Sequence, residues 1–201
     1  MNVYDFDGTI YYPNVMVSFS RYCIKHHPHL IFTYLFPFIG ASIKYAFKKI
    51  SRDDLFSLFD GVCKHLKNPE KELEGFWKKH EKNMSSWYLA QRRSDDIVIS
   101  GSPSYVIQPI ADKLGFNLVA TKINLKTGEL EGEVILARQK AKYFIERDMP
   151  FIDNFYSDSV IDTPLALLAE NAHLVTKKAT TITPWPHIDD IRKKVNKKIN
   201  K

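Results

Sequence analysis

The sequence predicts an α/β fold in which a Rossmann-like parallel sheet carries an all-helical insertion. Short apolar, β-prone segments typical of buried strands recur along the chain, at residues 1–4, 97–99, 117–121, 153–156 and 172–175. Helical patterns separate these segments, and residues 13–93 contain helical patterns alone. Strands that alternate with helices favour a parallel sheet, and the long helical stretch favours a second, all-α unit.

The composition is that of a folded protein with one domain and an insertion, or with two small domains. The chain has 201 residues, of which 44% are hydrophobic and 13% aromatic. Its formal net charge of +6 fits an anionic substrate or surface, and no motif typical of DNA or RNA binding is present. Cys23 and Cys63 are far apart in the sequence, and a strand pattern begins at residue 1. We therefore expect a cytoplasmic location without a secretory signal.

Two carboxylates follow the first predicted strand in the string Asp5-Phe6-Asp7-Gly8-Thr9. Asp5 stands where the strand should end, and Gly8 allows the backbone to turn sharply. Ligands of open α/β sheets bind outside the carboxyl ends of the strands. Two carboxylates in one small volume raise each other's pKa unless a cation lies between them. The pair therefore suits either a metal site or the separate roles of nucleophile and acid.

The strand at residues 97–99 ends in a group of residues suited to an anion. Ser100 and Gly101 follow it directly, and Pro103 at a first helical position, with Ser102 as N-cap, predicts a helix from there. A hydroxyl, backbone N–H groups and the helix dipole would then all face a negatively charged ligand.

The strand at residues 153–156 leads into two further carboxylates, Asp158 and Asp162. Their spacing of four residues places both on one side of a helix start. Between the second and fourth motifs, a predicted helix begins near residue 138 and contains Lys140 and Lys142. Each of the motifs therefore falls at the end of a strand or at the start of a helix.

In this order the motifs resemble those of the haloacid dehalogenase (HAD) superfamily, in its phosphoserine-phosphatase-like branch, where a helical cap lies between the first and second motifs. The resemblance rests on motifs over residues 1–12 and 94–178, and on position and helical character alone over the cap. It implies an α/β core at residues 1–12 and 94–185, with a helical cap at residues 13–93. Residues 186–201 form a separate C-terminal tail, which is rich in Lys and Arg.

The resemblance also implies catalytic roles. Asp5 matches the nucleophile that forms an aspartyl-phosphate, and Asp7 matches the general acid that protonates the leaving alcohol. Lys140 matches the lysine that steadies the nucleophile and the phosphate, with Lys142 as the alternative. The residues that match phosphate contacts are Thr9, Ser100, Gly101 and Lys140.

A magnesium site is implied by the same resemblance. The matching ligands are the carboxylates of Asp5 and Asp158 and the main-chain carbonyl of Asp7, while Asp162 matches the second acid that supports the metal water or the lysine. Mg²⁺ prefers such oxygen ligands, and it removes the repulsion between a carboxylate and a phosphate dianion.

These features predict a Mg²⁺-dependent hydrolase of small phosphomonoesters. Asn14 stands where phosphoserine phosphatases carry an acid, and residues 55–62 contain no cap arginine. We therefore expect a neutral or apolar leaving group, which could be lipid-derived, because the predicted cap is rich in apolar side chains, including Phe56, Phe59, Phe76 and Trp77. Phosphoserine phosphatase, a phosphotransferase or mutase on the same core, and a non-catalytic scaffold are the alternatives.

Two segments raise the question of a membrane surface. The apolar run Leu30–Ile43 has 14 residues, too few to span a bilayer, and contains Pro37 and Gly40. It fits a buried cap helix or dimer face, or contact with a membrane surface or lipid-like substrate. The basic segment 187–201 fits a solvated tail or helix, or a helix on a membrane surface.

Overall fold

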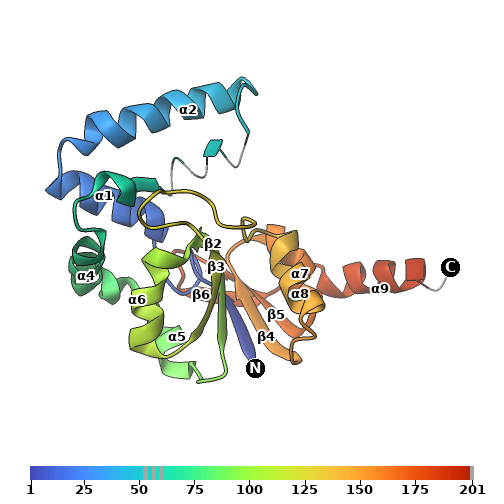
Figure 1. Ribbon diagram of the computed structural model, residues 1–201. Coiled ribbons are helices and arrows are strands. Elements are labelled where there is room, and N and C mark those ends of the chain that lie inside the picture. The colour runs from blue at the N-terminus through green and yellow to red at the C-terminus, as the bar shows by residue number, and fades with distance from the viewer. Residues whose placement is uncertain (52–53, 56–57, 59–60, 200–201) are drawn as a thin grey trace.

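The computed structural model describes residues 1–51, 54–55, 58 and 61–199 (Figure 1). The helix expected to begin at Ser51 and to continue through Val62 therefore lies largely outside the described residues, as do Phe56 and Phe59. At its start, the Ser51 hydroxyl oxygen accepts the N–H of Asp54 at 3.0 Å, as an N-cap does.

A six-stranded sheet forms the centre of the molecule, in the order β3-β2-β1-β4-β5-β6. The pairs from β3 to β5 are parallel, and β6 runs antiparallel to β5 at the edge. The predicted α/β fold with a mainly parallel sheet is thereby confirmed. The strands are β1 (Asn2–Asp5), β2 (Ile97–Pro103), β3 (Asn117–Thr121), β4 (Ile152–Ser157), β5 (Ala169–Thr176) and β6 (Thr181–Pro184).

Helices account for most of the remaining chain. Those that precede β2 are α1 (Val15–His26), the π-helical turn η1 (Ile31–Leu35), α2 (Phe36–Ala46), η2 (Gly61–His65), α4 (Pro69–His80), η3 (Glu81–Asn83) and α5 (Ser86–Gln91). Those that follow β2 are α6 (Ser104–Leu114), α7 (Arg138–Glu146), η4 (Val160–Asp162), α8 (Thr163–Ala166) and α9 (Ile188–Ile199).

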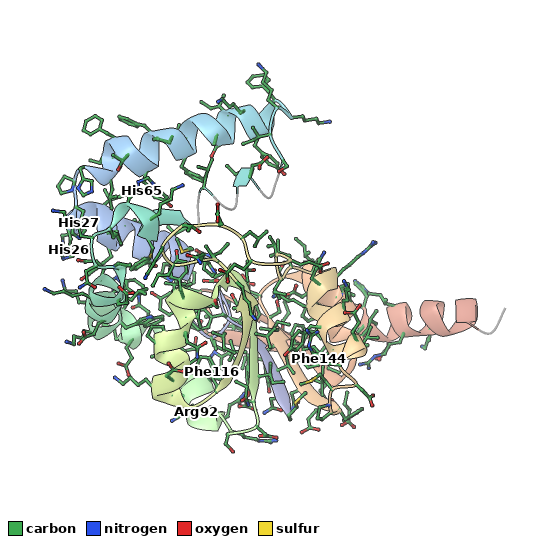
Figure 2. The ribbon with its side chains drawn as sticks, in the orientation of Figure 1. His26, His27, His65, Arg92, Phe116 and Phe144 are labelled. Carbon is green, nitrogen blue, oxygen red and sulfur yellow. The ribbon has the colours of Figure 1, made fainter. Side chains whose placement is uncertain are left out.

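The two faces of the sheet are buried in separate hydrophobic clusters. Side chains alternate along each strand, so Val3 and Tyr4 of β1 belong to different clusters. Figure 2 labels one member of each, Phe116 at the end of α6 and Phe144 on α7, on opposite sides of the sheet. Helices on both faces explain why β1 and residues 97–100 of β2 are buried on both sides.

The helical insertion shares the first of these clusters with the sheet. Phe19 of α1 and Phe76 of α4 meet edge to face, with ring centroids 5.3 Å apart. Trp77 donates its indole N–H to the carbonyl of Val106 on α6 at 2.7 Å. The insertion is therefore anchored to the core, while the cap boundaries at residues 13 and 93 remain predictions.

Three expectations about local structure need correction. Strand β2 continues through Ser102 to Pro103, so Ser102 is not the N-cap of α6. The hairpin expected over residues 122–134 is reduced to one antiparallel bridge, Ile123 with Leu130, because the Asn124 side chain accepts the next N–H groups and closes a local turn. Strand β6 lies in a segment where the sequence predicted none.

The apolar run Leu30–Ile43 is not a buried helix in this chain. Only Leu30, Tyr34 and Ala41 of that run are buried, and several of its large apolar side chains are exposed. No helix among the described residues is both long and apolar enough to cross a membrane.

Candidate active site

The carboxyl ends of three neighbouring strands meet at one edge of the sheet. Strand β1 lies between β2 and β4, so the end of β1 at Asp5 adjoins both. Ser100 stands on β2 one residue past Ile99, the partner of Asp5 in the sheet register. Asp158 follows the last residue of β4. The motifs that were far apart in the sequence are thereby brought to one edge.

Lys140 links two of the carboxylates. Its ammonium lies 2.5 Å from Oδ1 of Asp5 and 2.7 Å from Oδ2 of Asp162. All three side chains are buried. Burial by itself lowers the pKa of Lys140, but the two carboxylates outweigh it, and the pKa is raised above its usual value. Lys140 is therefore a charged, fixed cation at the end of β1.

Asp5 is held from both sides. One carboxylate oxygen accepts from Lys140, and the other lies 3.5 Å from the hydroxyl of Thr9. Burial raises the pKa of Asp5, and Lys140 opposes that shift. Its carboxylate is fixed in direction, as a nucleophile or a metal ligand requires.

Asp7 faces the end of β2. Its Oδ1 accepts the N–H of Val15 at 2.5 Å, and its Oδ2 accepts the Ser102 hydroxyl at 2.6 Å and the Ser100 hydroxyl at 3.4 Å. Burial raises the pKa of Asp7 to about 6, although the hydrogen bonds with Ser102 and Val15 oppose the shift. A carboxyl group with a pKa in this range can both give and take a proton near neutral pH.

Asp158 packs against the turn that follows Asp7. Gly8 has φ +76°, and a Cβ placed there would lie 2.2 Å from Oδ2 of Asp158. The glycine is therefore required both by the backbone conformation and by the approach of this carboxylate. Burial, followed by the charge of Asp5, raises the pKa of Asp158 to about 6.

The donor set and the charge balance of the site fit a hard divalent cation. Asp5, Asp158 and Asp162 influence one another electrostatically, and Lys140 forms ion pairs with Asp5 and Asp162. Within the described part of the chain, no group of three or more His, Cys, Asp or Glu side chains is arranged as a metal site. The predicted Mg²⁺ ligands do not require such a group of three side chains, because they are two carboxylates and one main-chain carbonyl.

Most predicted site residues converge at this edge, and of the two candidate lysines it is Lys140 whose ammonium reaches Asp5. Gly101 has its open side against Leu136, whose Cδ2 would lie 2.5 Å from an added Cβ. Lys142 is half-exposed and pairs with Glu133 and Glu146, away from Asp5.

Two serines that contact the site carboxylates were not predicted, Ser102 at Asp7 and Ser157 at Asp162, with hydroxyl-to-carboxylate distances of 2.6 and 2.9 Å. Strand periodicity was the available signal for Ser102, because residues 100 and 102 of one strand share a face. For Ser157, the signal was its place at the end of β4, directly before Asp158.

Comparison with solved structures shows the same fold in several bacterial proteins. A protein of unknown function from Bordetella pertussis Tohama I superposes with a TM-score of 0.71 at 16% identity, over 98% of this chain and 95% of that one. A phosphoserine phosphohydrolase-like protein from Francisella tularensis subsp. tularensis SCHU S4 gives 0.57 at 16% identity, over 88% of each chain.

A probable phosphoserine phosphatase from Vibrio cholerae gives a TM-score of 0.60 at 13% identity, over 85% of this chain and 54% of that one. No curated protein sequence matches the chain. At these identities the structures show the fold, and the family is shown by sequence. Residues 3–167 match the model of the haloacid dehalogenase-like hydrolases, and the chain belongs to that family of hydrolases.

Proposed function

We propose that this hydrolase cleaves phosphomonoesters through an aspartyl-phosphate on Asp5 and depends on Mg²⁺. The observation that carries the proposal is the buried ion pair of Lys140 with both Asp5 and Asp162. Beside it, Asp7 accepts hydrogen bonds from Ser100 and Ser102 of β2. A carboxylate fixed by a lysine suits attack on phosphorus, and a nearby carboxyl group can protonate the leaving oxygen.

In the first step, an oxygen of Asp5 attacks phosphorus and the bond from phosphorus to the alcohol oxygen breaks. Asp7 gives its proton to that oxygen, so the alcohol leaves neutral. In the second step, Asp7 takes a proton from water as the water oxygen attacks the phosphorus bound to Asp5. Inorganic phosphate leaves, and both carboxyl groups return to their starting states.

Positive charge and hydrogen-bond donors hold the transferring phosphoryl group. Lys140, which contacts Asp5, and the Ser100 hydroxyl, which contacts Asp7, would donate to its oxygens, which carry the spreading negative charge. The carboxylates of Asp5 and Asp158 and the main-chain carbonyl of Asp7 would hold Mg²⁺, which neutralises the repulsion between nucleophile and phosphate.

Removal of the metal, or of Asp158, tests this proposal. We expect phosphate release from p-nitrophenyl phosphate to need added Mg²⁺ and to stop in excess chelator. Asp158→Ala should reduce activity roughly 100-fold or more, or raise the Mg²⁺ concentration needed, because one carboxylate of the proposed metal site is lost. Asp95→Ala is the matched control, since Asp95 is exposed and outside the site. Full wild-type activity in chelator, or in Asp158→Ala without added metal, would contradict the assignment.

For the substrate we propose a phosphomonoester with a neutral or apolar leaving group, a class that includes lipid-derived monoesters. Asn14 occupies the place of the acid, and its side chain caps α1 by accepting the N–H of Val17 at 3.0 Å. A zwitterionic amino acid would then lack a partner for its ammonium, and an unpaired charge in a closed site is unfavourable.

A screen of phosphomonoesters by phosphate release tests the substrate class. We expect kcat/KM for neutral and apolar monoesters to exceed that for phosphoserine by about tenfold or more, because one unpaired buried charge costs at least ~1.4 kcal/mol. A phosphoserine value above all others would make the chain a phosphoserine phosphatase. Transfer of phosphate to an added sugar in preference to water would make it a phosphotransferase.

A further inference from the structure

An exposed apolar stripe runs along η1 and α2. Its members, here called the η1–α2 stripe, are Phe32, Phe36, Ile39, Ile43 and Phe47. Phe32 and Phe47, near its two ends, are 70% and 71% exposed. The rings of Phe32 and Phe36 touch, with centroids 5.6 Å apart. Spacings of three and four residues place the members on one side of the helix. A continuous exposed stripe of this kind marks a contact surface.

The fold of the chain does not need the stripe. The segment is attached through its other side, where Leu30, Tyr34 and Ala41 are buried. The Tyr34 hydroxyl lies 3.1 Å from that of Ser20 on α1. The helix is therefore anchored already, and the stripe remains available to a partner.

The stripe lies at the same end of the molecule as the candidate active site. Figure 1 shows the N-terminus at the lower end of the sheet, so β1 finishes at the upper end, on the side where α1 and α2 lie. Helix α2 is the outermost of these, and in Figure 2 side chains project from its outer side. A flat partner that met α2 would therefore meet the end of the molecule that holds Asp5.

The segment that carries the stripe has charges of one sign. From residue 8 to residue 52 the sequence contains no Asp or Glu and six Lys or Arg. Three of these, Lys44, Lys48 and Lys49, are exposed at the C-terminal end of α2, next to Ile43 and Phe47. The partner should therefore combine an apolar layer with negative charge.

We propose that the η1–α2 stripe docks the protein on the surface of an anionic membrane. An amphipathic helix lies in the plane of the interface, with its apolar side chains below the phosphates and its lysines beside them. A second copy of this chain is the less suitable partner. A two-fold contact would bring two segments without carboxylates face to face, and their lysines and arginines would repel one another.

Vesicle co-sedimentation of the full chain tests this docking. We expect binding to vesicles of phosphatidylcholine mixed with phosphatidylserine, much weaker binding to phosphatidylcholine alone, and loss of binding as salt screens the charges. The triple variant Phe32→Ser, Phe36→Ser, Ile43→Ser should bind roughly tenfold or more weakly, because each buried side chain contributes. Its matched control replaces Ile145, Phe151 and Ile161 by Ser. These three side chains are exposed to a similar degree and lie outside η1 and α2.

A second set of variants separates local charge from the net charge of the protein. Replacing Lys44, Lys48 and Lys49 by Glu should weaken binding roughly fivefold or more for each residue. The same change at the exposed Lys82, Lys122 and Lys126 keeps the net charge equal and should have a much smaller effect.

The proposal is overturned if the wild-type chain does not bind anionic vesicles, or if stripe and control variants bind equally. It is also overturned if ultracentrifugation shows a wild-type dimer that the triple variant breaks while vesicle binding is absent, since the partner is then a second copy. Because Asp5→Asn should still bind vesicles, docking can succeed or fail independently of the proposed hydrolysis.

Discussion

Asp5→Asn should abolish phosphate release, with kcat reduced by roughly 10⁴-fold or more, while the fold remains intact. The amide has the same shape as the carboxylate, but its oxygen is a far weaker nucleophile and cannot form the aspartyl-phosphate. Steady-state and burst kinetics with p-nitrophenyl phosphate and saturating Mg²⁺ measure the loss. Activity near the wild-type level would remove Asp5 from the mechanism.

The same change should not lower stability when no metal is bound. Burial raises the pKa of Asp5, so its charged form is disfavoured in the folded protein at neutral pH. The neutral amide removes that unfavourable contribution, and Lys140 keeps its ion pair with Asp162. Thermal unfolding in chelator should therefore show a Tm equal to or above that of the wild type. Asp112→Asn, at an exposed carboxylate that accepts from Gln108, is the matched control and should change neither activity nor Tm.

The strand-end motifs were predictable because parallel strands bring their carboxyl ends to one edge. Asp5, Ser100 and Asp158 could be assigned to one site from their positions after buried runs, and the structure brings those positions together. Ser102 escaped prediction because β2 continues past Ser100 with an irregular register, and the sequence suggested a helix start there. Strand β6 escaped because it is short and mostly exposed, so it carries little hydrophobic pattern.

The sequence could not choose between Lys140 and Lys142. Residues two apart on a helix point about 200° away from each other, so the choice depends on how α7 is rotated. That rotation is set by the loop that enters the helix through Ala137, which has φ +41°. The apolar run Leu30–Ile43 posed the same difficulty, since its composition does not reveal which side the rest of the chain covers.

Lys140→Met should remove activity and also destabilise the protein. Methionine fills a similar volume but leaves Asp5 and Asp162 buried without their shared cation. Breaking a buried ion pair from one side costs about 3–5 kcal/mol, because the remaining charge is uncompensated. We expect this loss in the free energy of unfolding by denaturant, and a fall in kcat of roughly 100-fold or more because the charge facing the phosphoryl group is gone.

Lys142→Met is the matched control, because Lys142 is half-exposed and its pairs with Glu133 and Glu146 lie at the surface. Such pairs contribute about 0–1 kcal/mol, so stability and activity should stay close to the wild type. A double variant then separates the two effects of Lys140. Adding Asp162→Asn to Lys140→Met removes one uncompensated carboxylate and should restore part of the lost stability without restoring activity. If the double variant regains activity together with stability, Lys140 acts by supporting the fold and does not contact the phosphoryl group. Equal effects of Lys140→Met and Lys142→Met would contradict the assignment of Lys140 altogether.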